Sequence, residues 1–180
     1  HSEFSTWQQL MDDFRHRLSA GDVSIRDRLP ADPLRLAQVF QVHVGRAQML
    51  DIIAKHVPND DYEPGPTYHK IASIPWHAVV TTNYDDLLER AFQYSREVRQ
   101  IVWDADLTQR RTPGDLAVIK MHGDLKFRDS VVLTEEDYRI YERTRPGMAV
   151  KIRQLLLEHP LLFVGFSLSD PNATSFDGWI

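Results

Sequence analysis

The first third of the chain carries apolar residues at three- and four-residue spacing, which is the period of an α-helix with one buried face. This pattern predicts an amphipathic helix over residues 4–18, with Ser5 as the candidate N-cap. One longer helix is predicted over residues 33–54, because Pro33 suits the first helical position and apolar residues recur throughout. Residues 58–66 are rich in Pro, Gly and Asp, so we expect a loop there.

Beyond residue 75 the pattern changes to short apolar runs that alternate with helical spacing. Strands are predicted at residues 78–82, 98–103, 116–121, 130–133 and 161–164. Helices are predicted near residues 87–92, 134–141 and 147–159. The last apolar run is typical of a strand covered on both faces of a parallel sheet. The chain therefore predicts an α/β fold, a doubly wound, Rossmann-like parallel sheet, with a helical segment of about residues 30–72 inserted before the first strand.

Composition and charge narrow the class of protein. With 180 residues, 42% of them hydrophobic and 26% charged, the chain is typical of a globular domain, and we expect a single domain over residues 1–180. The net charge is -5 and Lys and Arg do not cluster, which argues against a nucleic acid partner. No stretch approaches the roughly 20 apolar residues of a membrane span. The first residues also lack the basic, apolar and small-residue regions that follow one another in a signal peptide. We therefore expect a cytoplasmic protein without membrane contact.

The chain has no cysteine, which excludes disulfides, thiolate nucleophiles and thiolate zinc sites. Its histidines show no metal-binding spacing such as H-E-x-x-H. We therefore predict that no metal is bound.

Polar residues that directly follow apolar strands are the candidates for chemistry, because ligands bind outside the carboxyl ends of parallel strands. Three groups qualify, at residues 81–85, 122–124 and 165–172. Each also has a purely structural interpretation. The acidic and amide residues of the first group are good helix caps, His122 can be a packed histidine beside a glycine turn, and the third group can be a tight turn. No group decides between these interpretations alone.

Four motifs in order resemble the bacterial sirtuin-like domain family. They are T-T-N-Y-D at residues 81–85, K-M-H-G-D at 120–124, L-T-E-E-D-Y at 133–138 and F-V-G-F-S-L-S-D-P-N at 163–172. The resemblance covers residues 74–172, and four linked motifs are more specific than any one of them. It implies NAD as the substrate, with Asn83 and Asp85 at the nicotinamide end and His122 at the adjacent ribose hydroxyls. These three are the expected catalytic residues.

The resemblance also implies further contacts with NAD. The expected cofactor-binding residues are Thr82, Gly123, Asp124, Gly165, Ser167, Asp170 and Asn172. Two features depart from the family. Protein-deacetylating sirtuins carry a four-cysteine zinc module, which this chain lacks. The family's opening strand and Gly-x-Gly phosphate loop, which should precede the Phe4 helix, are also absent from this sequence. We therefore expect the chain to be incomplete at both ends and part of a longer protein.

The expected function is hydrolysis of NAD to nicotinamide and ADP-ribose by a bacterial anti-phage defence effector. The expected partners are copies of the chain or a larger defence assembly. One alternative is a non-catalytic module that binds NAD or ADP-ribose. Another is an NAD-dependent protein deacylase or ADP-ribosyltransferase, which the missing cysteines disfavour.

Overall fold

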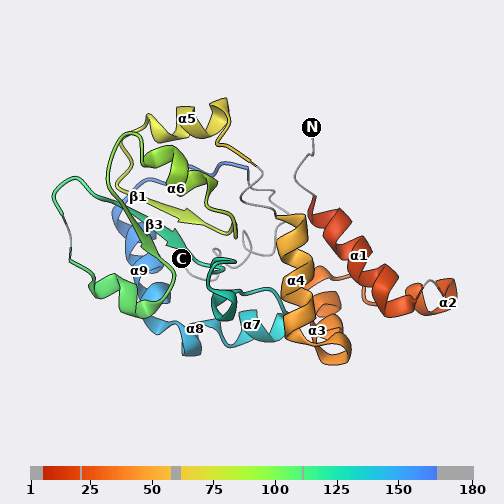
Figure 1. The fold of residues 1–180 in the computed structure, drawn as a ribbon. Helices are drawn as coiled ribbons and strands as arrows, with labels where there is room; N and C mark the ends of the chain where they lie inside the picture. Colours follow the sequence, from red (N-terminus) through yellow and green to blue (C-terminus); the bar gives the residue numbers. More distant parts are fainter. Residues whose placement is uncertain (1–5, 21, 58–61, 111, 166–180) are drawn as a thin grey trace.

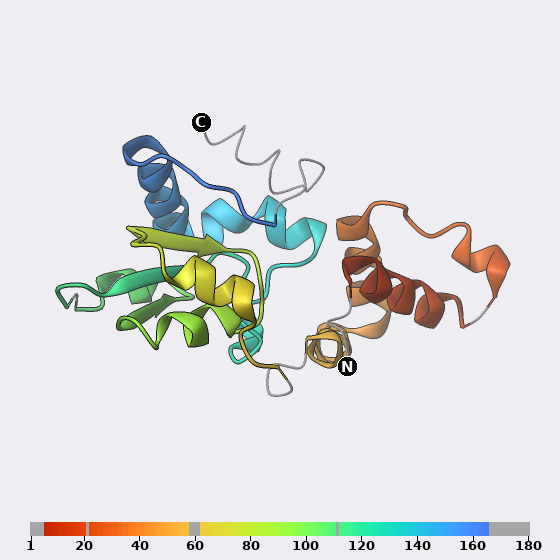
Figure 2. The same ribbon diagram turned by 90° about the horizontal axis from the view of Figure 1, so that it is seen from above.

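The computed structural model of the protein describes residues 6–20, 22–57, 62–110 and 112–165. The chain begins with a group of helices and continues into a sheet flanked by helices (Figure 1). Figure 2 shows the first group to one side of the sheet. The first group consists of α1 (Trp7–Ser19), α2 (Val23–Arg26), α3 (Pro33–Val44) and α4 (Arg46–His56).

Helix α1 is capped by Thr6. The backbone N–H of Gln9 donates to Thr6 Oγ1 (3.2 Å), and the backbone N–H of Thr6 donates to Gln9 Oε1 (2.6 Å). This reciprocal capping box satisfies N–H groups that have no partner inside the helix. The prediction of Ser5 as the cap was wrong by one residue, and residues 4 and 5 lie outside the described residues.

The single helix predicted over residues 33–54 is two helices, because the chain turns at Gly45. Pro33 occupies the first position of α3 as predicted, after the cap Asp32. Gly45 has a φ of 102°, which residues with a Cβ rarely adopt and which cannot continue a helix. Helix α4 begins at the next residue, Arg46. Because apolar spacing continues across the glycine, the pattern did not reveal the turn.

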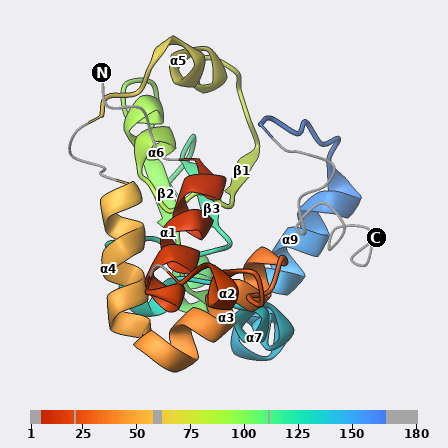
Figure 3. The ribbon, with the colours of Figure 1, turned by 90° about the vertical axis from the view of Figure 1, so that its right-hand side faces the viewer.

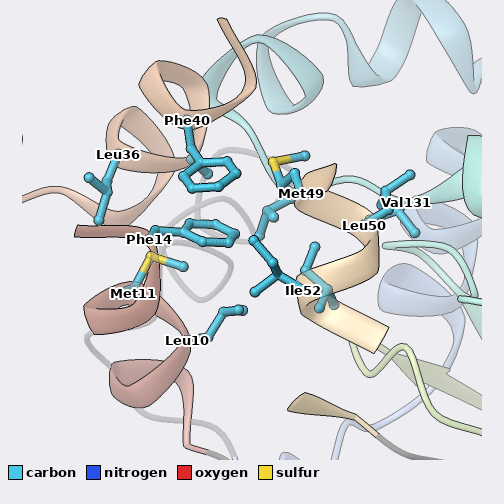
Figure 4. Packing of buried hydrophobic residues seen from close by; sticks show 12 residues of the cluster. Leu10, Met11, Phe14, Leu36, Phe40, Met49, Leu50, Ile52 and Val131 are labelled. Atoms are coloured by element: carbon cyan, nitrogen blue, oxygen red, sulfur yellow. The ribbon is translucent and has the colours of Figure 1, made fainter. Parts of the chain in front are cut away.

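Helices α1, α3 and α4 enclose the first hydrophobic core. Phe14 and Phe40 are fully buried and stack with their ring centroids 4.4 Å apart. An aromatic pair of this kind adds about 0.5–1.5 kcal/mol beyond the burial of its surface. Figure 4 shows Met49 of α4 near these rings and Val131, from the segment after the sheet, on the far side of α4. The core therefore joins the helical group to a loop of the α/β part.

The sheet is parallel and has the order β1-β3-β2. Its strands are β1 (Ala78–Thr81), β2 (Val98–Ile101) and β3 (Leu116–Lys120). The predicted α/β class is confirmed. The elements around the sheet are α5 (Pro66–Ala72), α6 (Leu87–Phe92), α7 (Glu135–Arg139), α8 (Tyr141–Thr144), α9 (Pro146–Glu158) and the 3₁₀ helices η2 (Asp104–Thr108) and η3 (Arg128–Ser130). No helix within the described ranges is long and apolar enough to cross a bilayer.

Helices cover both faces of the sheet, as the wholly buried central strand β3 requires. Ala117 and Ile119 of β3 belong to the core made with α8 and α9. The alternate residues Leu116 and Val118 belong to the core made with α5 and α6. Figure 3 shows α6 and α9 on opposite sides of the strands. This alternation confirms the doubly wound arrangement for the strands that the structure describes.

Two predicted strands are not strands. Residues 130–133 are buried, but Val132 donates its backbone N–H to His122 O (2.9 Å) and Leu133 donates to Asp137 Oδ2 (3.0 Å). A turn and a side chain thus take the place of a neighbouring strand. Residues 161–164 are exposed and form no strand in the structure, although they are wholly apolar. An apolar run indicates a segment that can be buried and does not by itself determine how the segment pairs.

The turn after β3 requires glycine at position 123. Gly123 has a φ of +85°, and a Cβ on this residue would lie 2.1 Å from the backbone oxygen of Ser130. The next residue, Asp124, donates its backbone N–H to Ser130 Oγ (2.8 Å). Because the glycine has no side chain, η3 can close directly against the turn. The position is therefore explained by packing within the protein.

Substitution of this glycine tests the close contact. Gly123→Ala combines an unfavourable φ, which costs about 1–2 kcal/mol, with overpacking, which costs about 1–3 kcal/mol. We expect a loss of about 2–5 kcal/mol in the free energy of unfolding, measured by urea denaturation. Gly114→Ala is the matched control, because Gly114 has a φ of +90° and nothing within 4 Å of its Cβ position. An equal loss in both variants would show that the contact with Ser130 contributes nothing.

Candidate active site

Asn83 and His122 leave the sheet side by side. Each is the second residue after its strand, since β1 ends at Thr81 and β3 ends at Lys120. The two strands are parallel neighbours, and Thr81 is paired with Lys120. The backbone N–H of Met121 continues the pairing by donating to Thr81 O (3.0 Å). The T-T-N-Y-D and K-M-H-G-D loops therefore follow neighbouring parallel strands at the same edge of the sheet.

A cleft lies beside the first of these loops. Its volume is about 540 Å³, and α5, β1, α9 and residues 160–165 enclose it. Thr82, Asn83 and Gly165 line it, as does Met121 from the loop after β3. The Asn83 side chain is exposed, while its backbone N–H donates to Thr81 Oγ1 (3.1 Å). Pockets of about 300–1,000 Å³ are typical of small-molecule sites, so the cleft has the size that a ligand needs.

His122 lies below this surface. Only 4% of the residue is exposed, and it is not among the residues that line the cleft, although its neighbour Met121 is. Its Nε2 is 3.2 Å from the hydroxyl of Tyr138, and the two rings meet edge to face at 5.2 Å. A buried imidazole held by a hydroxyl has a restricted orientation and tautomer.

A buried ammonium group joins the two loops from beneath. Lys120 is completely buried, and its Nζ lies 2.8 Å from Asp124 Oδ2 and 3.2 Å from Glu89 Oε1. The same Nζ donates to the backbone oxygen of Asp85. Gln100 Nε2 donates to Asp124 Oδ2 (2.6 Å) and Glu89 Oε1 (3.2 Å). This buried cluster therefore connects the loop after β1, helix α6 and the loop after β3.

Burial governs the carboxyl groups around Lys120. Desolvation raises the pKa of Asp85 above its usual 3.8 and that of Glu89 above its usual 4.5, although the Lys120 charge opposes both shifts. The Oδ1 atom of Asp85 accepts from the backbone N–H of Leu87 (3.1 Å), the first residue of α6. The capping interpretation left open by the sequence is thus observed for Asp85.

The remaining predicted contacts divide into two groups. Gly123 and Asp124 hold the loop after β3, Gly123 through its contact with Ser130 and Asp124 through its completely buried carboxylate. Gly165 lines the cleft with a φ of +72°. Ser167, Asp170 and Asn172 lie outside the described residues. Their assignment as cofactor-binding residues stays a prediction.

Sequence reasoning missed four residues that surround the site. Lys120, Glu89 and Tyr138 stand inside or beside the quoted motifs, and a charged residue ending an apolar strand was the available signal for Lys120. Tyr68 of α5 lines the cleft, and nothing in its local sequence sets it apart. No group of three His, Asp or Glu residues suited to a metal occurs in the part of the chain that the structure describes. The absence of a metal stays a prediction.

Removal of the buried ammonium should strongly destabilise the fold. Lys120→Met leaves two carboxylates buried without their cation, and breaking a buried pair in this way costs about 3–5 kcal/mol. Lys126→Met is the control, because the Lys126 side chain is 57% exposed and its buried partner Asp86 (2.6 Å) keeps a second cation, Arg90, at 3.5 Å. The loss of an ion pair with an exposed cation costs about 0–1 kcal/mol. Urea unfolding measures the loss of stability in both variants. Similar losses would contradict the stabilising role assigned to the buried cluster.

The raised pKa of Glu89 predicts a specific pH dependence. Above the ordinary pKa of 4.5, the unfolded chain ionises this group before the folded chain does. The contribution of Glu89 to the free energy of unfolding therefore falls as the pH rises toward the raised pKa, and it is constant above that pKa. Glu89→Gln removes this contribution, so the stability of the variant relative to the unmodified protein should rise as the pH increases above about 4.5. Urea unfolding across this range measures the difference, and a trend in the opposite direction would refute the raised pKa.

Three relatives with assigned names align with much of the chain. Defense-associated sirtuin 2 of Bacillus subtilis is 27% identical over 182 residues, which cover 99% of this chain and 18% of that protein. The NAD(+) hydrolase ThsA of Enterococcus faecium is 27% identical over 172 residues, covering 94% of this chain and 35% of that protein. The NAD(+) hydrolase ThsA of Bacillus cereus is 35% identical over 106 residues, covering 58% of this chain and 22% of that protein. The chain thus spans between 18% and 35% of the length of these relatives.

The sequence profile of the SIR2-like domain family matches residues 77–176. This range is more than half of the 180 residues, and it begins just before β1 and contains both loops of the candidate site. The expected resemblance is confirmed, and the chain belongs to the SIR2-like domain family.

Proposed function

We propose that this chain is the NAD-hydrolysing part of a bacterial anti-phage defence protein, and that it cleaves NAD to nicotinamide and ADP-ribose. The observation that carries the proposal is the placement of Asn83 and His122 just after neighbouring parallel strands, with Asn83 and the neighbour of His122, Met121, lining a cleft of about 540 Å³. The names of the relatives, which are NAD(+) hydrolases and a defense-associated sirtuin, support the choice of NAD and of a defence role.

The reaction requires groups of the kind found at this edge. Cleavage passes through an oxocarbenium-like state, so the protein has to hold the ribose and place water on one face. The water oxygen bonds to the ribose anomeric carbon as the carbon–nitrogen bond breaks, and nicotinamide leaves with the bonding electron pair. We assign the exposed amide of Asn83 to orienting the water and His122 to accepting its proton, because imidazole exchanges protons near neutral pH.

Other residues of the site have supporting roles in the proposal. Asp85 contacts the nicotinamide carboxamide through Oδ2, since its Oδ1 accepts from Leu87. Thr82 and Gly165 approach the sugar and phosphates from the wall of the cleft. Asp124 fixes the loop that carries His122. Association with further copies or with a larger defence assembly stays a prediction, consistent with relatives that are longer than this chain.

Incubation of the full-length protein with NAD tests the proposal. His122→Ala should lower kcat by about 100-fold or more, because loss of a general base costs about 10²–10⁴-fold. Asn83→Ala should also lower kcat, and nicotinamide release measured by chromatography follows both. His43→Ala is the matched control, since His43 is exposed on α3, away from the sheet, and should retain full activity.

The outcomes separate the candidate functions. Undiminished turnover in both site variants would refute the site. Binding of NAD without turnover, under every activating condition tried, would indicate the non-catalytic module. Nicotinamide release only in the presence of an acylated or acceptor protein would indicate a deacylase or ADP-ribosyltransferase.

A further inference from the structure

We propose that Tyr138 is a positioning residue for His122, and that Arg46 of the helical group holds Tyr138 in place. The inference rests on the proposed function, because it assigns the orientation of the proton acceptor to a residue outside the two loops. The Tyr138 hydroxyl is 3.2 Å from His122 Nε2, and the rings meet at 66°. His122 is 4% exposed, so this contact acts on an imidazole that is shielded from bulk water.

The contact can fix the proton on the imidazole. A neutral imidazole carries its proton on one ring nitrogen, and a hydroxyl bound at Nε2 favours one tautomer and one ring orientation. A proton acceptor has to present its lone pair toward the reacting water, so its tautomer matters as much as its place. Tyr138 acts through His122 and has no direct contact with NAD in this proposal.

The helix that carries Tyr138 is too short to be stable alone. Helix α7 has 5 residues, whereas isolated helices shorter than about 12–15 residues are marginal in water. Its start is fixed locally, because Thr134 Oγ1 accepts from the backbone N–H of Asp137 (3.1 Å) and Asp137 Oδ2 accepts from that of Thr134 (3.0 Å). Further support has to come from other elements.

Helices α3 and α4 supply that support along the first turn of α7. Arg46 Nη1 lies 3.2 Å from Asp137 Oδ2, and its Nη2 donates to Val131 O. Gln38 Oε1 accepts from the backbone N–H of Glu136 (3.2 Å). Arg35 and Glu135 form an exposed ion pair at 3.1 Å, which contributes little. Arg46 is partly buried and contacts both α7 and the segment before it. It is therefore the residue through which the helical group fixes the position of Tyr138.

The test uses the full-length protein and NAD. Tyr138→Phe keeps the ring and removes the hydroxyl, so kcat should fall by about tenfold, the effect of one ordinary hydrogen bond, while KM changes by less than about twofold. Tyr94→Phe is the matched control, because Tyr94 is 81% exposed, and its kcat should be unchanged. Arg46→Met should also lower kcat. In the double variant, Arg46→Met should lower kcat by less than about a further twofold relative to Tyr138→Phe alone. A full additional loss would overturn the path from Arg46 through Tyr138.

A second measurement does not depend on turnover. Selective isotope labelling of histidine gives the ring-nitrogen signals of each imidazole, and loss of one set in His122→Ala assigns His122. Tyr138→Phe should change the tautomer balance of this imidazole and of no other, whereas an unchanged balance would overturn the proposal. Full activity of His122→Ala together with a changed balance would instead refute the proposed function and leave the contact established. If Tyr138→Phe does not fold, Arg46→Met must show the same tautomer change, and an unchanged balance there overturns the proposal equally.

Discussion

The buried ammonium of Lys120 is the interaction on which the geometry of the candidate site depends. It lies within 3.2 Å of carboxylates from Glu89 and Asp124, and it also donates to the backbone of Asp85. Each of these ions would cost several kcal/mol if buried alone, so separating them is strongly unfavourable. Because the partners belong to three segments of the chain, one charge fixes the loop after β1, the start of α6 and the loop after β3 together.

The segment between η3 and α7 joins two of the three hydrophobic cores in the part of the chain that the structure describes. Val131 and Leu133 belong to the core of α1, α3 and α4, whereas Val132 belongs to the core over the sheet. The hydroxyl of Tyr84 donates to Val132 O (2.8 Å), which ties the loop after β1 to the same segment. Side chains that alternate in this way are typical of a strand, and here they alternate between two cores. The helical group therefore borders the site through a segment that both cores bury.

The sequence predicted what local patterns determine and missed what tertiary contacts determine. Period and composition placed β1, β2 and β3 and most helices, and the rule for parallel strands placed Asn83 and His122 at one edge. The break at Gly45 escaped because one residue with a φ of 102° does not disturb apolar spacing. The depth of Lys120 and the contact of Tyr138 with His122 escaped because they join residues that no periodic pattern relates. The strand expected at 161–164 does not form, since apolar character alone does not determine strand pairing.

The difference in burial between Asn83 and His122 agrees with the different tasks proposed for them. A group that orients water and sugar must be reached by both, and Asn83 is exposed on the wall of the cleft. A group that accepts a proton needs a fixed lone pair more than a wide approach, and His122 is held beneath the surface by Tyr138. Burial removes the competing hydrogen bonds of solvent, so the Tyr138 hydroxyl has a strong influence on how the imidazole is presented. The rigid framework under both residues therefore matters for the chemistry as well as for stability.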